Sequence, residues 1–289
     1  MTDPAHDPAA VLASIREEWD LVADGPVTTT HAAALQPVLA EGGPAFLKVA
    51  AVHPETAHES LALQHWAGRG AVRLLRADPR RRALLMERLG PRHLRELPVL
   101  EACEVVAGLY ADLHVPAPPQ LVTLPAYVGR WLPALARLPR DAPIPHRLVE
   151  QAVALARDLD DEASVGRLVH GDLHDENVLD GGARAEWLAI DPQPLSGDPH
   201  YEPAPMLWNR WDDLAREAGS VRDAVRRRFH TVVDAAGLDE DRAVAWTVVR
   251  MVVDAYWSIE DAERELRPLV PEELESITRS VVIAKAVQD

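Results

Sequence analysis

The chain has 289 residues, of which 47% are hydrophobic and 26% charged, as expected for a soluble globular protein of one large or two modest domains. Its net charge of −16 repels phosphate backbones, which argues against DNA or RNA as a partner, and it would attract a cationic small molecule. Most of this charge is explained by an acidic, solvated surface that keeps the protein soluble. The single cysteine, Cys103, excludes an internal disulfide and a cysteine-based zinc site. Its apolar neighbours at helical spacing predict a core residue.

The N-terminal residues show no basic stretch followed by an apolar core, so we expect no signal peptide. No apolar run approaches the length that spans a bilayer, so we expect no membrane contact. These features predict a cytoplasmic protein, and we expect a monomer.

Residues 27–89 have the pattern of short strands with one helix. Glu41-Gly42-Gly43 separates two apolar runs and predicts a hairpin, and Asp78-Pro79 predicts a second one. The order of elements is therefore strand, strand, helix, strand, strand. The expected strands cover residues 37–40, 45–50, 72–75 and 83–86, and the expected helix covers residues 55–66.

From Pro98 onward the pattern is mostly helical, with proline-rich joints at residues 116–119 and 143–145. The stretch 166–191 breaks this pattern and predicts a loop followed by a hairpin that turns at Gly181-Gly182. Expected helices cover residues 99–114, a segment ending near 160, and residues 221–236, 241–256 and 272–286. We place the domain boundary after Leu89, giving an N-terminal part of residues 1–89 and a C-terminal part of residues 90–289.

The strongest chemical signal is His170-Gly171-Asp172, followed by Asn177 and then by Asp191 at the end of an apolar strand. Phosphoryl transfer needs a carboxylate that orients the attacking hydroxyl and accepts its proton, and oxygen ligands that hold Mg²⁺ against the phosphates. Asp172 and Asn177 lie on one loop, and the hairpin brings Asp191 back beside it. The sequence therefore predicts a phosphoryl-transfer site.

Each of these residues also has a structural interpretation: Asp172 as a turn residue, Asn177 as a cap and Asp191 as the start of a turn with Pro192. The complete pattern is much rarer than any of these alone, which favours catalysis. His170 and His174 are four residues apart and allow a zinc site, but Gly171 disrupts the helical face that such a pair needs, and no third ligand is evident.

Lys48 ends a short apolar strand, where a buried ammonium requires a carboxylate or a phosphate partner. Glu59 is the expected partner because it lies on the apolar face of the next helix, at i, i+4, i+7 with Leu63 and Trp66. Glu55, one turn earlier, is the alternative. An ordinary surface salt bridge is the competing interpretation, and the downstream motif favours a pair that directs Lys48 at phosphate oxygens.

Taken together, these residues resemble the aminoglycoside phosphotransferases of the eukaryotic-like kinase fold. Two longer stretches resemble the streptomycin 6-kinase and hydroxyurea phosphotransferase branch. One is Trp187 to Asp198 followed by Tyr201-Glu202-Pro203-Ala204, and the other is Gly70 to Leu75 with Leu84 to Leu89. The resemblance begins near Val27. It implies an α+β, bilobal protein-kinase-like fold, with a small β-rich nucleotide-binding lobe carrying one key helix and a larger, mainly helical catalytic lobe.

The family implies a role for each residue of the motif, with ATP or GTP and Mg²⁺ as cofactors. Asp172 would be the catalytic base, Asn177 and Asp191 the metal ligands, Lys48 the ligand of the α- and β-phosphates, and Glu59 the residue that positions Lys48. The adenine would meet the hinge Glu87, Arg88 and Leu89.

The motifs also differ from those of protein kinases. Gly171 replaces the arginine of the catalytic loop, Asp191-Pro192-Gln193 replaces Asp-Phe-Gly, and no GxGxxG is present. We place the phosphate-covering loop within residues 24–33, with Thr28, Thr29 and Thr30 as donors. These departures fit antibiotic kinases and argue against a protein kinase.

The acceptor should bind to the helical lobe, facing Asp172. Carboxylates and aromatic rings follow the metal ligand closely and suit an amino- or guanidinium-bearing sugar. The tryptophans are equally well explained as helix packing. The candidate acceptor-binding residues are Asp172, Glu176, Asp198, Glu202, Trp208, Trp211 and Asp212, with Asp213, Asp254, Tyr256 and Trp257 as further candidates.

We expect an antibiotic kinase acting on a streptomycin-like aminoglycoside. Hydroxyurea or a cellular sugar or amino alcohol is the alternative acceptor. A nucleotide-binding regulator without catalysis is the non-enzymatic alternative, against which the complete set of Lys48, Asp172, Asn177 and Asp191 argues.

Overall fold

The computed structural model describes residues 7–30, 32–53, 56–184, 186–214, 217 and 219–288. Glu55, the alternative partner of Lys48, lies outside these residues. The chain forms two compact units: Met1–Glu96 with Glu176–Pro194, and Leu97–Asp175 with Leu195–Asp289. The first unit thus extends past Leu89 and takes in a later segment of the chain that is bonded to it. The Val72 N–H donates to the Ala189 carbonyl at 2.9 Å, and the Gly90 N–H donates to the Asp180 carbonyl at 2.7 Å.

The first unit contains a six-stranded sheet whose main path runs β1-β3-β4-β6-β5, with β2 paired to β3. A separate hairpin of β8 and β9 belongs to the same unit. The elements are α1 (Pro8–Glu18), β1 (Val22–Ala23), β2 (Thr28–Thr29), β3 (Ala33–Ala40), β4 (Gly43–Ala50), α2 (Glu59–Trp66), β5 (Leu74–Asp78), β6 (Ala83–Glu87), η3 (Leu94–Glu96), β8 (Val178–Asp180), η5 (Gly182–Arg184) and β9 (Trp187–Ala189).

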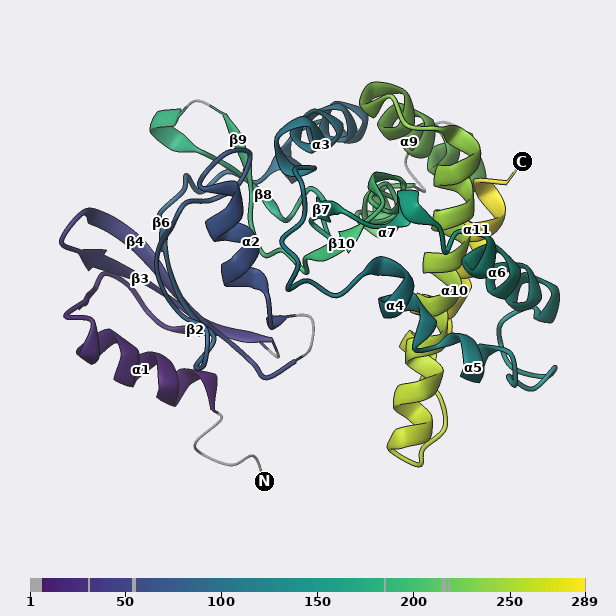
Figure 1. The fold of residues 1–289 in the computed structure, drawn as a ribbon, viewed down its shortest axis with the longest axis horizontal. Helices are drawn as coiled ribbons and strands as arrows, with labels where there is room; N and C mark the ends of the chain where they lie inside the picture. The colour runs from purple at the N-terminus through teal and green to yellow at the C-terminus, as the bar shows by residue number, and fades with distance from the viewer. Residues whose placement is uncertain are drawn as a thin grey trace. The chain divides into compact units, whose positions relative to one another are not determined.

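The two predicted hairpins are present as β3–β4 and β5–β6, both antiparallel. Alternation along the strands separates two faces of the sheet. Leu47 and Val49 of β4 pack with Leu12 and Ile15 of α1 in one core cluster. Lys48 therefore points to the opposite face, toward α2. Figure 1 shows the two helices on opposite sides of this sheet.

Helix α1 was not predicted. Asp7 caps it by accepting a hydrogen bond from the Ala9 N–H at 3.1 Å, and Pro8 occupies its first position, which a proline favours. Leu12 and Ile15 are fully buried, with Trp19 just beyond the helix end. This i, i+3, i+7 spacing and the Asp-Pro cap were the available signals. Helix α2 begins at Glu59 rather than residue 55 and ends at Trp66. Ala67 caps it in the left-handed conformation, with a φ of 53°.

The second unit is mainly helical and includes one two-stranded sheet, β7 with β10. Its longest helix, α10, contacts α6 and α11. The elements are α3 (Val99–Leu113), α4 (Leu124–Gly129), α5 (Leu132–Leu135), α6 (His146–Asp158), η4 (Glu162–Ser164), β7 (Arg167–Val169), β10 (Leu195–Gly197), η6 (Pro199–Tyr201), α7 (Pro205–Trp208), α8 (Trp211–Leu214), α9 (Val221–Ala236), α10 (Glu240–Arg264) and α11 (Pro271–Ala286).

The long helices lie where the apolar periodicity predicts them, although α10 continues eight residues beyond Tyr256. Cys103 is fully buried in α3, and burial raises the pKa of its thiol to about 12, as expected of an inert core cysteine. Within the described part of the chain, no helix combines the length and apolar character needed to cross a bilayer.

Candidate active site

In the first unit, Lys48 and Glu59 form the ion pair that the helical spacing predicts. Lys48 Nζ lies 2.7 Å from Glu59 Oε1, and the two side chains are only 7% and 3% exposed. Lys48 also contacts the carboxylate of Asp191. Burial alone would lower the pKa of Lys48, but the two carboxylates outweigh it and raise the pKa to about 12. The ammonium is therefore charged and held from two sides.

The strand register places Thr28 on the same face of the sheet as Lys48. Leu35 of β3 lies directly opposite Lys48 on one side and opposite Thr28 on the other. Residues that face each other across strands point to the same side of a sheet. Thr29 pairs with Ala34 and so shares the opposite face with α1. Thr30 instead closes the turn, since its Oγ1 accepts from the Ala33 N–H at 3.0 Å.

The β8–β9 hairpin brings Asn177 and Asp191 to the same end of one element. Val178 pairs with Ala189, and the Ile190 N–H donates to the Asn177 carbonyl at 2.9 Å. Asp191 follows immediately, with a φ of 57°, which is uncommon outside glycine and most accessible to Asp and Asn. A backbone conformation of this kind costs about 1–3 kcal/mol in folding free energy. It is kept where the surrounding structure enforces it, often at functional sites.

An amide oxygen and a carboxylate at one hairpin end are the oxygen donors that Mg²⁺ prefers, with phosphates and water completing its shell. Across the described residues, no three His, Cys, Asp or Glu side chains gather in a way that could hold a metal ion by themselves. Asn177 and Asp191 therefore suit a magnesium ion that is shared with a nucleotide. Nothing in the donor set suits a closed, protein-only metal centre.

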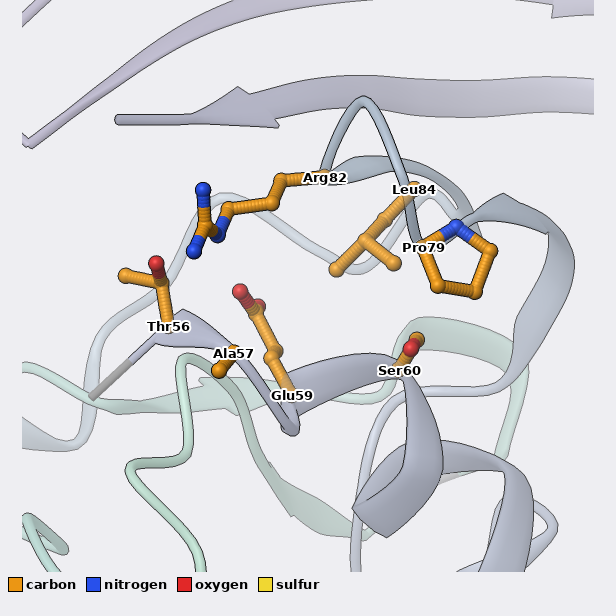
Figure 2. Close-up of a pocket in the computed structure, with 7 residues that line it drawn as sticks. All are labelled: Thr56, Ala57, Glu59, Ser60, Pro79, Arg82 and Leu84. Carbon is orange, nitrogen blue, oxygen red and sulfur yellow. The ribbon is translucent and has the colours of Figure 1, made fainter. Parts of the chain in front are cut away.

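A small pocket lies beside Glu59 in the first unit (Figure 2). The Glu59 carboxylate and the Arg82 guanidinium point into the same space, with Thr56 at its edge. The Thr56 hydroxyl donates to the Ala51 carbonyl at 2.9 Å, which ties the chain before α2 to the end of β4. The pocket thus lies at the start of α2, the helix whose Glu59 positions Lys48, next to the Thr56 hydrogen bond that ties the chain to β4.

The predicted hinge residues have side chains engaged in contacts within the first unit. Glu87 Oε1 accepts from the Arg73 N–H and from Arg184 Nη1, both at 2.8 Å. The Arg88 guanidinium donates to the Val38 carbonyl at 2.8 Å and to Asp24 at 2.7 Å. These contacts fix the strand end that leads into Leu89.

In the second unit, the catalytic-loop motif follows directly from β7. Pairing of Val169 with Leu195 of β10 fixes the start of the loop. Glu202, which is fully buried, accepts hydrogen bonds from the N–H groups of His170 at 3.1 Å and Gly171 at 2.8 Å. Burial would raise the pKa of Glu202, but these donors and the nearby imidazole of His114 hold it below its usual value.

Arg250 of α10 supports the same loop and was not predicted. Its Nη2 donates to the Gly171 carbonyl at 2.6 Å and lies 4.0 Å from Asp172 Oδ1. The guanidinium lies over the rings of Tyr201 and Trp208, at 4.4 and 4.8 Å from their centroids. Arg250 lies 79 residues from Gly171 in the sequence, so no local sequence signal points to this contact and only the fold reveals it.

The residues predicted to bind the acceptor fall into two groups. Asp198 and Glu202 are 1% and 0% exposed, and Asp198 is bound by Arg242 and Trp246 at 2.5 and 2.8 Å. They hold the structure beneath the loop and present no surface to a ligand. The others retain accessible surface, namely Asp172, Glu176, Trp208, Trp211 and Asp212. Glu176 belongs to the first unit, where it pairs with Arg95, and both tryptophans pack partly against the helical core.

A sheet-rich unit with a buried lysine–glutamate pair and a helical unit with an aspartate on a loop are the parts of a small-molecule kinase. The crystal structure of a thermostable variant of the aminoglycoside phosphotransferase APH(4)-Ia, in complex with ADP and hygromycin B, aligns with a TM-score of 0.59. It covers 96% of this chain and 98% of that one at 16% identity, a likeness that shows the fold alone. The chain therefore has the kinase-like fold of the aminoglycoside phosphotransferases.

Sequence comparison identifies the family. The model of the aminoglycoside/hydroxyurea antibiotic resistance kinases matches residues 18–262, and the chain belongs to this family. The streptomycin 6-kinase of Streptomyces glaucescens is 39% identical over 267 residues, 90% of this chain and 85% of that protein. The hydroxyurea phosphotransferase of Kitasatospora aureofaciens is 40% identical over 261 residues, 87% of this chain and 73% of that protein. The predicted family, fold and enzyme class are thereby confirmed.

Proposed function

We propose that this kinase transfers the γ-phosphoryl group of ATP or GTP, with Mg²⁺, to a hydroxyl of a streptomycin-like aminoglycoside. The observation that carries the proposal is the 39% identity to a streptomycin 6-kinase along 90% of the chain. The complete set of Lys48, Asp172, Asn177 and Asp191 supports turnover rather than a regulatory role.

On the nucleotide side, Lys48 would hold the α- and β-phosphates and Glu59 would keep its ammonium directed at them. The face of the sheet that carries Lys48 also carries Phe46 and Met86, which are opposite each other and offer an apolar surface for the base. Thr28 lies on that face as a donor for the phosphates. The backbone of residues 87–89 would meet the edge of the base.

For the chemical step, Asp172 would orient the acceptor hydroxyl and accept its proton as the oxygen attacks the γ-phosphorus. Asn177 and Asp191 would hold Mg²⁺, which when bound neutralises charge on the phosphate oxygens. The exposed carboxylates Asp212 and Glu176 are candidates for binding the cationic groups of the acceptor. The acidic chain, of net charge −16, favours the approach of a cation.

The test is ADP release with purified protein against streptomycin, other aminoglycosides and hydroxyurea, reading kcat/KM for each. Streptomycin should be the best acceptor, and Asp172→Ala should lower kcat roughly 10²–10⁴-fold, as expected on loss of a general base. High turnover of hydroxyurea with poor turnover of streptomycin would overturn the acceptor assignment and favour a hydroxyurea phosphotransferase. Nucleotide binding without turnover of any acceptor would favour the regulatory alternative.

A further inference from the structure

His174 lies two residues after the proposed base, and the transfer mechanism gives it no role. In the second unit its ring lies between two polar side chains and is largely buried, with 14% of the side chain exposed. Nε2 lies 3.8 Å from Asp172 Oδ2, and Nδ1 contacts the amide nitrogen of Asn209. Each ring nitrogen therefore faces a different partner.

The hydrogen bonds around Asn209 assign the proton on this ring. Asn209 Oδ1 accepts from the Arg210 N–H at 3.3 Å, so the NH₂ group of the amide is the one that faces His174. An amide NH₂ can only donate, which makes Nδ1 of His174 an acceptor. The single proton of a neutral imidazole is then on Nε2, directed at Asp172. A hydrogen on Nδ1 would face the N–H of the Asn209 amide, donor against donor.

Asn209 is itself held by a buried ion pair. Its carbonyl accepts from Arg228 Nη1 at 2.8 Å, and Arg228 is fully buried and lies 2.5 Å from Glu217. This bond holds the main chain of Asn209, and the bond from the Arg210 N–H to Oδ1 keeps its amide NH₂ turned toward His174. The orientation of the ring is thus set by contacts outside the catalytic loop.

The remaining charged groups near Asp172 act from other elements. Arg250 of α10 lies 4.0 Å from Oδ1, on the oxygen that His174 does not face. The carboxylates of Glu202 and Asp254 act on Arg250 in turn, and the His170 ring accepts the Asp172 N–H at 3.3 Å. Among these neighbours, all within the described part of the second unit, His174 offers the carboxylate a neutral donor.

We propose that His174 is a positioning residue for the base: as a neutral imidazole oriented by Asn209, it donates through Nε2–H to Asp172 Oδ2. The proposal rests on the proposed role of Asp172. The 3.8 Å separation is longer than a hydrogen bond, so the proposal requires the Asp172 carboxylate to rotate toward the ring, whose orientation Asn209 sets. A donor to the charged form favours the ionised carboxylate, so the base stays ready to accept a proton at lower pH.

The first test compares His174→Ala with His174→Gln, since the Gln amide can place an N–H near the position of Nε2. We expect His174→Ala to lower kcat by about 10-fold or more and to move the acidic limb of the kcat/KM–pH profile up by about one pH unit, with the nucleotide KM unchanged. His174→Gln should recover most of the lost kcat and most of the shift in the acidic limb. The control His146→Ala, on the partly exposed start of α6, should leave the profile unchanged.

If His174→Ala lowers kcat/KM but leaves the acidic limb of the pH profile unmoved, His174 is only structural. The same conclusion follows if kcat of His174→Gln is no higher than that of His174→Ala. The second test is ¹⁵N NMR of the imidazole nitrogens, which needs no turnover and so stays decisive if no acceptor is phosphorylated. We expect the Nε2–H tautomer in the wild type and a mixture in Asn209→Leu. A charged ring or an Nδ1–H tautomer in the wild type overturns the proposal. Wild-type activity that survives Asp172→Ala would instead refute the proposed function.

Discussion

Replacing Glu59 by glutamine removes one charge from a buried ion pair and keeps the side-chain shape. A pKa of about 12 for Lys48, against an ordinary 10.5, corresponds to about 2 kcal/mol in favour of the charged lysine in the folded protein. Removing one partner of a buried pair costs roughly 3–5 kcal/mol when nothing replaces it. Burial raises the pKa of Glu59 even beside Lys48, so its charge costs stability by itself, and Asp191 remains in contact with Lys48. We therefore expect Glu59→Gln to lower the free energy of unfolding by less than this range, about 1–3 kcal/mol.

The measurement is urea denaturation at pH 7 and again near pH 11, followed by tryptophan fluorescence. The folded-state pKa of Lys48 is raised, so the stabilisation is fully present below pH 10.5 and is lost as pH rises through about 12. The difference between wild type and Glu59→Gln should therefore be constant near neutrality and should narrow above pH 10.5. In kinetic assays the variant should lose nucleotide kcat/KM because Lys48 is no longer directed.

Glu18→Gln is the matched control, because Glu18 and Arg81 are also 2.7 Å apart but their side chains are 51% and 35% exposed. An exposed pair contributes little to stability, so this variant should behave like the wild type. If Glu59→Gln proves as stable as Glu18→Gln, burial of the Lys48–Glu59 pair does not contribute to the free energy of unfolding. If stability falls but nucleotide kinetics do not change, the pair is structural and does not serve phosphate binding.

Three further changes test the second unit. Gly197→Ala would place a Cβ 2.9 Å from Val169 Cγ2, so we expect a loss of about 1–3 kcal/mol in thermal unfolding, and an unchanged Tm would contradict this packing. Arg228→Met leaves Glu217 with only the partly exposed Arg227, 3.3 Å away, and should cost about 2–4 kcal/mol in urea, whereas a neutral result would show that the buried pair is dispensable. Burial would raise the pKa of Asp198, but hydrogen bonds hold it below its usual value; its stabilisation is thus present above about pH 4 and lost in acid. Asp198→Asn should flatten this acid dependence, and an equally steep loss would assign it to other groups.

Elements whose signals are local could be predicted from the order of amino acids alone. Glycine-containing turns predict β3–β4, and apolar periodicity predicts α3, α9 and α11 to within a residue or so at each end. The pairing of Lys48 with Glu59 followed from strand alternation and helical spacing, because both are set by neighbours a few residues away. The motif from His170 to Asn177 identified the class of chemistry for the same reason.

The contacts that support these residues come from the packing of elements far apart in the chain. Glu202, predicted to face a ligand, is buried beneath the loop and accepts its N–H groups. Arg250 and Asn209 reach the loop from 79 and 35 residues away, through hydrogen bonds to Gly171 and His174. No local pattern encodes such contacts, because a buried polar side chain takes whatever partner the packing of distant helices brings within hydrogen-bond reach.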